Sequence, residues 1–121
     1  MSVYATIMSA TYLIVGVGTL YVGLRARQAK LPMNSWIGLR TPKLMANEDT
    51  WVLGHKAAAG YLMLAGAAFT IGGILFMIID ESLIAFVSLP VLAILLITTV
   101  LATKKANAAA EQYRTTKALE A

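Results

Sequence analysis

Three long apolar runs restrict the fold of this chain more than any other feature of its sequence. They cover residues 3–24, 57–79 and 83–102, and none contains Asp, Glu, Lys or Arg. About 20 apolar residues of helix cross the hydrocarbon core of a bilayer, which is about 30 Å thick. Only 13% of the chain is charged, against about 25% in a typical soluble domain. We therefore expect an all-α integral membrane bundle of three helices, forming one membrane domain over residues 1–121.

The basic residues lie in only two of the regions outside these runs. Of the ten, six fall between the first and second runs and four follow the third: Arg25, Arg27, Lys30, Arg40, Lys43 and Lys56, then Lys104, Lys105, Arg114 and Lys117. Because basic residues collect on the cytoplasmic side of a membrane, we expect residues 31–56 and the tail 104–121 inside and the N-terminus outside. This distribution also explains the net charge of +4 without nucleic acid as a partner.

Local signals set the ends of the first two predicted helices. Pro32 cannot continue a helix and restricts the residue before it, so the first helix should end near residue 30. Asn47 suits the N-cap of a second helix over residues 48–79, which has acidic residues in its first turn. The first two turns of that helix then project beyond the hydrocarbon core. They carry Trp51 and His55 on one face, because residues four apart are neighbours on a helix.

The third helix has an internal proline and a polar continuation. Pro90 removes one backbone hydrogen bond, so we expect a kink there. Residues 104–121 are rich in Ala, Lys, Glu and Gln, which are good helix formers. We therefore expect the helix to extend into the cytoplasm.

Glycines in the second helix predict that it is the central one. Gly54, Gly60, Gly66 and Gly72 recur every six residues, a spacing that rotates them around the helix. Small residues let helices approach closely in lipid, where no hydrophobic force drives them together. We expect neighbours on several sides of this helix, with ordinary membrane glycine content as the open alternative.

The segment between the first two helices does not have the composition of a solvated connector. Half of residues 31–46 are apolar. We therefore expect an interfacial loop that lies against the membrane or folds back onto the bundle. Trp36 and Trp51 suit the headgroup level, where tryptophan is enriched. Arg40 has three open interpretations: a positive-inside charge, an anchor that bonds a backbone carbonyl or an acidic residue, and a contact to lipid phosphate or a partner.

A pattern in and after this segment resembles the SdpI-like membrane proteins. It consists of Asn34, Trp36, Gly38, Arg40, Thr41 and Pro42, then Trp51 and His55 four apart at the head of a helix, with Gly60 following. The resemblance implies an integral protein of the bacterial cytoplasmic membrane. For the founding member it implies immunity to a secreted peptide toxin and signalling. The chain has about the size of the C-terminal part of larger relatives and lacks their extra spans. The binding residues that the motif implies are Asn34, Trp36, Gly38, Arg40, Thr41, Trp51 and His55.

The motif residues can also have purely structural roles. We expect His55 to be structural, bonding the loop or Trp51, because the chain has no second histidine and no cysteine to complete a metal site. Thr41 and the proline after it predict a rigid turn. Gly38 predicts either a positive φ or a close approach. We expect neither a metal nor another cofactor.

The sequence favours binding over catalysis. It predicts no paired carboxylates inside a pocket, no plausible Ser/His/Asp arrangement and no phosphate loop, and Asp80 and Glu81 are neighbours in an exposed turn. No span carries an ionisable residue at mid-membrane depth, as ion and proton pathways usually require. We therefore expect a non-enzymatic protein that acts in immunity or signalling by binding a peptide or protein partner in the lipid bilayer. The alternative is an accessory subunit of a larger bacterial membrane complex, and a homo-oligomer stays open.

Overall fold

The computed structural model describes residues 1–120, and its three long helices are each long and apolar enough to cross a membrane. The predicted all-α, three-helix membrane bundle is therefore confirmed. Two short 3₁₀ helices precede the second and third long helices. The elements in order are α1 (Val3–Arg27), η1 (Leu44–Ala46), α2 (Glu48–Phe76), η2 (Glu81–Leu83) and α3 (Ile84–Glu120).

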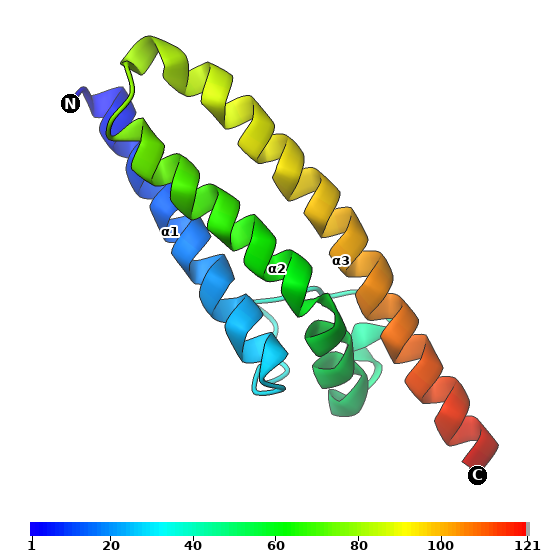
Figure 1. Cartoon of the computed structure of the whole chain (residues 1–121). Coiled ribbons are helices and arrows are strands. Elements are labelled where there is room, and N and C mark those ends of the chain that lie inside the picture. The colour runs from blue at the N-terminus through cyan, green and yellow to red at the C-terminus, as the bar shows by residue number, and fades with distance from the viewer. Residues whose placement is uncertain (121) are drawn as a thin grey trace.

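Helix α2 is the central element and lies between α1 and α3 (Figure 1). Its glycines allow both neighbours to approach closely. A Cβ atom at Gly66 would come within 2.6 Å of the backbone nitrogen of Leu20 in α1, and one at Gly54 within 3.1 Å of the Ala106 carbonyl oxygen in α3. The prediction of a central second helix is confirmed, although Gly60 opens onto empty space.

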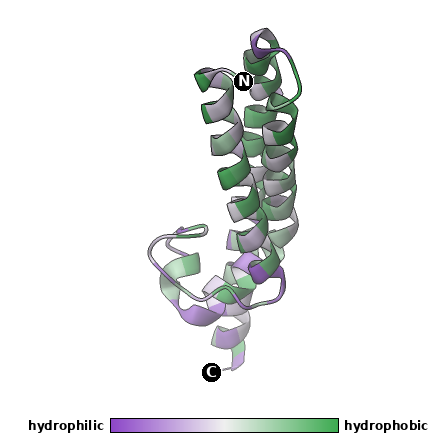
Figure 2. Cartoon of the chain, turned by 90° about the vertical axis from the view of Figure 1, so that its left-hand side faces the viewer, coloured by the Kyte–Doolittle hydropathy of each residue, from purple (hydrophilic) through white to green (hydrophobic). Residues whose placement is uncertain are grey.

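The two ends of the bundle differ in their connections. We call the end with residues 28–47 the loop end and the opposite end, with residues 77–83, the turn end. Near the turn end, the ring of Tyr12 packs against Phe69 and Phe76 with centroids 4.7 and 4.8 Å apart. Figure 2 shows that hydrophilic residues gather at the loop end, while hydrophobic residues dominate the rest of the bundle.

The observed boundaries of α1 and α2 follow the local signals closely. Helix α1 ends at Arg27, and α2 ends at Phe76, three residues before the predicted end at 79. Asn47 is the N-cap of α2, as predicted. Its side-chain oxygen accepts from the backbone N–H of Thr50 over 2.9 Å, and the Thr50 hydroxyl accepts from the backbone N–H of Asn47 over 3.1 Å. This reciprocal capping fixes where the loop segment joins α2.

Helix α3 continues without interruption through Pro90 to Glu120. The prediction that its C-terminal part is helical is confirmed, whereas the kink at Pro90 stays a prediction. Beyond the third apolar run, Ala106 and Ala110 are fully buried against Leu44 and Ala58. This part of α3 is therefore a wall of the loop end.

Candidate functional site: the loop and its histidine latch

Residues 28–47 cross from the end of α1 over α2 to α3 (Figure 1). Two leucines anchor the crossing at its ends. Leu31 is buried with Ala26 and Trp51, and Leu44 is buried with Ala58 among the alanines of α3. Of the two predicted arrangements, folding back onto the bundle is the one observed.

His55 connects the middle of the loop to α2. The backbone N–H of Leu39 donates a hydrogen bond to Nε2 of His55 over 2.8 Å. Because Nε2 accepts, the proton of the neutral ring lies on Nδ1, which donates to the Trp51 carbonyl oxygen over 2.8 Å. Both ring nitrogens are thus used, and the structural role predicted for His55 is confirmed. We call this arrangement the histidine latch.

The latch is shielded from solvent. His55 is 0% exposed, and its ring packs against that of Trp51 at an angle of 35°, with centroids 4.1 Å apart. His55 precedes the exposed Lys56, so it lies outside the apolar part of α2 that crosses the membrane. Burial lowers the pKa of His55 below its ordinary value of 6.5, while the hydrogen bond to the Trp51 carbonyl opposes that shift. The latch therefore contains neutral histidine at neutral pH.

Gly38 allows the loop to reach the latch. Its φ is +109°, a conformation that side chains other than glycine rarely adopt. A Cβ atom at this position would also lie 2.6 Å from Nε2 of His55 and 3.2 Å from the Trp51 ring. Both reasons predicted for a glycine here, a positive φ and a close approach, are confirmed.

Asn34 and Arg40 shape the tip of the loop. The side-chain oxygen of Asn34 accepts from the backbone N–H groups of Trp36 and Ile37 over 2.8 and 2.7 Å. A guanidinium nitrogen of Arg40 donates to the Ser35 carbonyl oxygen. Of the interpretations of Arg40, bonding to a backbone carbonyl is observed. Hydrogen bonds with Asn34, before the tip, and with Arg40, after it, therefore fix the tip of the loop.

Helix α3 supports the far side of the loop. The Thr41 hydroxyl donates to the side-chain oxygen of Asn107 and accepts from the backbone N–H of Leu44 over 3.3 Å. Lys43 forms an ion pair with Glu111 at 3.4 Å. The turn predicted after Thr41 is confirmed. The role of Asn107 was missed, and the alanines spaced four apart at 102, 106 and 110 are the only signal for a buried face here.

A further contact joins α3 to the start of α2. The Tyr113 hydroxyl donates to a carboxylate oxygen of Asp49 over 2.7 Å, and this hydrogen bond raises the pKa of the Tyr113 phenol. It lies at the surface, so it adds to the positioning of α3 rather than to a buried site.

The two tryptophans of the motif have opposite environments. Trp36 is 89% exposed, whereas Trp51 is 0% exposed. The expectation that Trp51 reaches the headgroups is therefore wrong, because Leu31, Gly38 and Ala59 enclose its ring within the protein. The interfacial position of Trp36 stays a prediction. Trp51 packs beneath the loop, and Trp36 projects from the loop into the surroundings of the protein.

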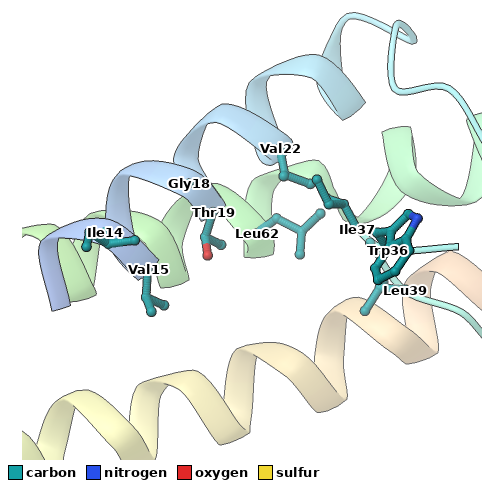
Figure 3. Close-up of a pocket in the computed structure, with 10 residues that line it drawn as sticks. Ile14, Val15, Gly18, Thr19, Val22, Trp36, Ile37, Leu39 and Leu62 are labelled. Atoms are coloured by element: carbon teal, nitrogen blue, oxygen red, sulfur yellow. The ribbon is translucent and has the colours of Figure 1, made fainter. Parts of the chain in front are cut away.

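A groove of about 410 Å³ lies beside the displayed tip. Figure 3 shows Trp36 and Leu39 at one end of the groove and Ile14 and Val15 at the other. Gly18, Thr19 and Val22 of α1 and Leu62 of α2 line the stretch between them, with Ile37 and Gly38 of the loop. Its wall is almost wholly apolar.

The motif residues thus fall into two groups. Gly38, Trp51 and His55 meet at the latch, while Asn34, Arg40 and Thr41 hold the loop on either side of it. Within residues 1–120, no three His, Cys, Asp or Glu side chains lie close enough together to hold a metal ion.

The profile of the SdpI/YfhL protein family matches residues 30–103, which is more than half of the chain. No curated protein and no solved structure matches the chain. The match begins in the loop, includes the whole latch and ends within α3.

Proposed function

The chain belongs to the SdpI/YfhL protein family, and from this premise we propose that it is a non-enzymatic binding protein of the bacterial cytoplasmic membrane. It acts in immunity or signalling by capturing a peptide or protein partner within the membrane. The basic residues at the loop end support an orientation with that end in the cytoplasm and the N-terminus outside.

The observation that carries this proposal is the exposure of Trp36 on a loop that is otherwise fixed. Its ring is 89% exposed and Ile37 is 50% exposed, although the backbone N–H groups of both residues are bonded by Asn34. A rigid loop loses little conformational entropy on binding. Tryptophan is also among the residues that most often carry the binding energy of an interface.

The proposal gives the motif residues different roles. Trp36 contacts the partner, together with Ile37. Asn34 and Arg40 hold the tip that displays them, and Trp51 and His55 hold the loop on α2. Removal of Trp36 should therefore abolish binding without loss of the fold, whereas removal of Trp51 should disturb both.

Gentle-detergent purification of the tagged chain from its native membrane tests the proposal. We expect a partner to co-purify with the wild-type protein, and Trp36→Ala to reduce its recovery at least tenfold. Phe86→Ala is the matched control, because Phe86 is also strongly exposed, at 71%, but lies near the turn end. Equal recovery of the partner with both variants would contradict a role for Trp36.

Challenge of the cells with a secreted peptide toxin distinguishes an immunity protein from an accessory subunit. If the protein confers immunity, cells with Trp36→Ala should become as sensitive as cells without the gene, at unchanged protein level. A large assembly recovered at fixed stoichiometry, together with unchanged peptide sensitivity on deletion of the gene, would instead support an accessory subunit.

A further inference from the structure

The groove beside the loop tip has the shape and polarity of a site for a hydrocarbon chain. Its volume of about 410 Å³ falls in the range of ligand pockets, roughly 300–1,000 Å³. It follows α1 from Ile14 to Val22, a rise of about 12 Å along the helix. Thr19 contributes a hydroxyl and Trp36 an indole N–H, and no charged residue lines the wall. An elongated apolar ligand that lies along the helix axis suits this space.

A cation is fixed near the loop end of the groove. Arg40 follows the lining residue Leu39 and donates one N–H to the carbonyl oxygen of Ser35, the residue before Trp36. Arg40 is exposed and forms no ion pair with any residue from 1 to 120. A guanidinium has five N–H donors in a planar fork that matches phosphate oxygens. Most of its donors are therefore free to bind an anion.

A second basic residue lies on the same side of α1. Arg25 follows Val22 by three residues, so it sits one turn beyond the groove on the same helix face. It is half-buried and also forms no ion pair within residues 1–120. The apolar groove is thus followed by two cations that form no ion pair, Arg25 beyond its α1 wall and Arg40 beyond its loop wall, and the exposed Trp36 lines the same end of the groove.

From this charge pattern we propose that the groove binds one anionic phospholipid. One acyl chain lies along α1 between Ile14 and Val22, and the phosphate meets Arg40, with Arg25 as the second cation. Basic sites between transmembrane helices bind anionic headgroups in this way. The inference does not depend on the proposed peptide partner. A second apolar helix would also fill the groove, but it would leave both cations without an anion.

Gly18 is a suitable position for a substitution that fills the groove. A Cβ atom at Gly18 would meet no atom within 4 Å, so Gly18→Leu directs its side chain into the groove from an open position. Gly60 in α2 is equally open but lies outside the groove, which makes Gly60→Leu the matched control. For the charge, Arg40→Gln is matched by Arg27→Gln, because Arg27 is exposed and lies five residues beyond Val22, away from the groove face.

Native mass spectrometry of the delipidated full chain in detergent measures the binding. The probes are phosphatidylglycerol and phosphatidylcholine with identical acyl chains. We expect the wild type to bind one phosphatidylglycerol at least tenfold more tightly than phosphatidylcholine. Gly18→Leu should weaken the binding of both lipids at least tenfold. Arg40→Gln should remove most of the preference for phosphatidylglycerol, while Gly60→Leu and Arg27→Gln should match the wild type.

Three results would overturn the proposal. One is equal affinity of the wild type for the two lipids. Another is an unchanged affinity of Gly18→Leu for phosphatidylglycerol. The last is a partner helix that crosslinks to Gly18→Cys and excludes lipid from the groove, because the occupant would then be a protein. If the wild-type protein binds phosphatidylglycerol but co-purifies with no peptide or protein partner, the result contradicts the proposed function and leaves the lipid site intact.

Discussion

The two ends of the bundle make their connections in different ways. At the turn end, the Asp80 side chain accepts from the backbone N–H of Ser82 over 3.0 Å, and its carbonyl oxygen accepts from the N–H of Leu83. At the loop end, hydrogen bonds join Leu39 to His55 and Thr41 to Asn107, residues 16 and 66 positions apart. A short turn between adjacent helices satisfies its own backbone groups. A long loop that covers a helix depends on distant side chains to satisfy its buried groups.

Substitution of Gly38 should damage the loop end most. In Gly38→Ala, the φ of +109° costs about 1–3 kcal/mol of strain, and displacement of His55 costs about 1–3 kcal/mol more through the lost hydrogen bond. The free energy of unfolding in mixed micelles measures the loss. Gly60→Ala is the control, because Gly60 has a free space around it. Equal stability of the two variants would show that the loop adapts without the latch.

Removal of the latch alone should have the next largest effect. His55→Leu puts an apolar side chain of similar size in place of the imidazole and leaves the partly buried N–H of Leu39 without its acceptor, at a cost of about 1–3 kcal/mol. The loop should then open, and trypsin should cleave after Arg40 faster than in the wild type. Cleavage at Lys104, beyond the loop, provides the internal reference. An unchanged ratio of the two cleavage rates would contradict the latch.

Acid should open the same latch in the wild-type protein. Burial lowers the pKa of His55 below 6.5, so the unfolded or open state binds more protons than the closed state as the pH falls. The stability of the closed loop should therefore be constant above about pH 6.5 and decrease below it. Quenching of tryptophan fluorescence between pH 7.5 and 5 measures the opening of the loop without trypsin. His55→Leu should lack this decrease, and a parallel decrease in that variant would assign it to another group.

The contact between the loop and α3 should contribute less. Thr41→Val removes the hydroxyl that joins Asn107 and caps the turn, at a cost of about 0.5–1.5 kcal/mol. A double-mutant cycle with Asn107→Ala measures the coupling between the two side chains. Strict additivity would mean that the contact does not stabilise the fold.

The turn end should tolerate substitution best. Ser82→Ala removes the side-chain hydrogen bond to Asp80 but keeps the backbone one, and the site is exposed. The stability should change by no more than about 0.5 kcal/mol, as at most surface positions. A larger loss than in Thr41→Val would reverse the comparison between the two ends.

The sequence predicted the helices and the ends of the loop better than its middle. The uncharged runs, Pro32 and the Asn47 cap are local signals, and they located α1, α2 and both ends of the loop. The structural role of His55 at the loop was also predictable, because the chain has no second histidine and no cysteine that could join His55 in a metal site. The bond between Thr41 and Asn107 was not, since no local pattern relates residues 66 positions apart.

Trp51 shows why an interfacial residue can be misjudged from composition. Its place near a membrane boundary predicted exposure to headgroups, yet the loop covers it completely. The face that Trp51 shares with Gly54, His55 and Ala58 consists otherwise of small or buried residues. That face indicated packing against protein, and only the path of the loop determined which segment would supply it.

The bond between Thr41 and Asn107 has a consequence for synthesis of the chain. The ribosome adds about 5–20 residues each second, so roughly 3–13 seconds separate these two residues. During that interval α1, α2 and the loop already exist, but the wall that α3 provides does not. Until α3 arrives, the loop is held on α2 by the histidine latch, without the bond from Thr41 to Asn107.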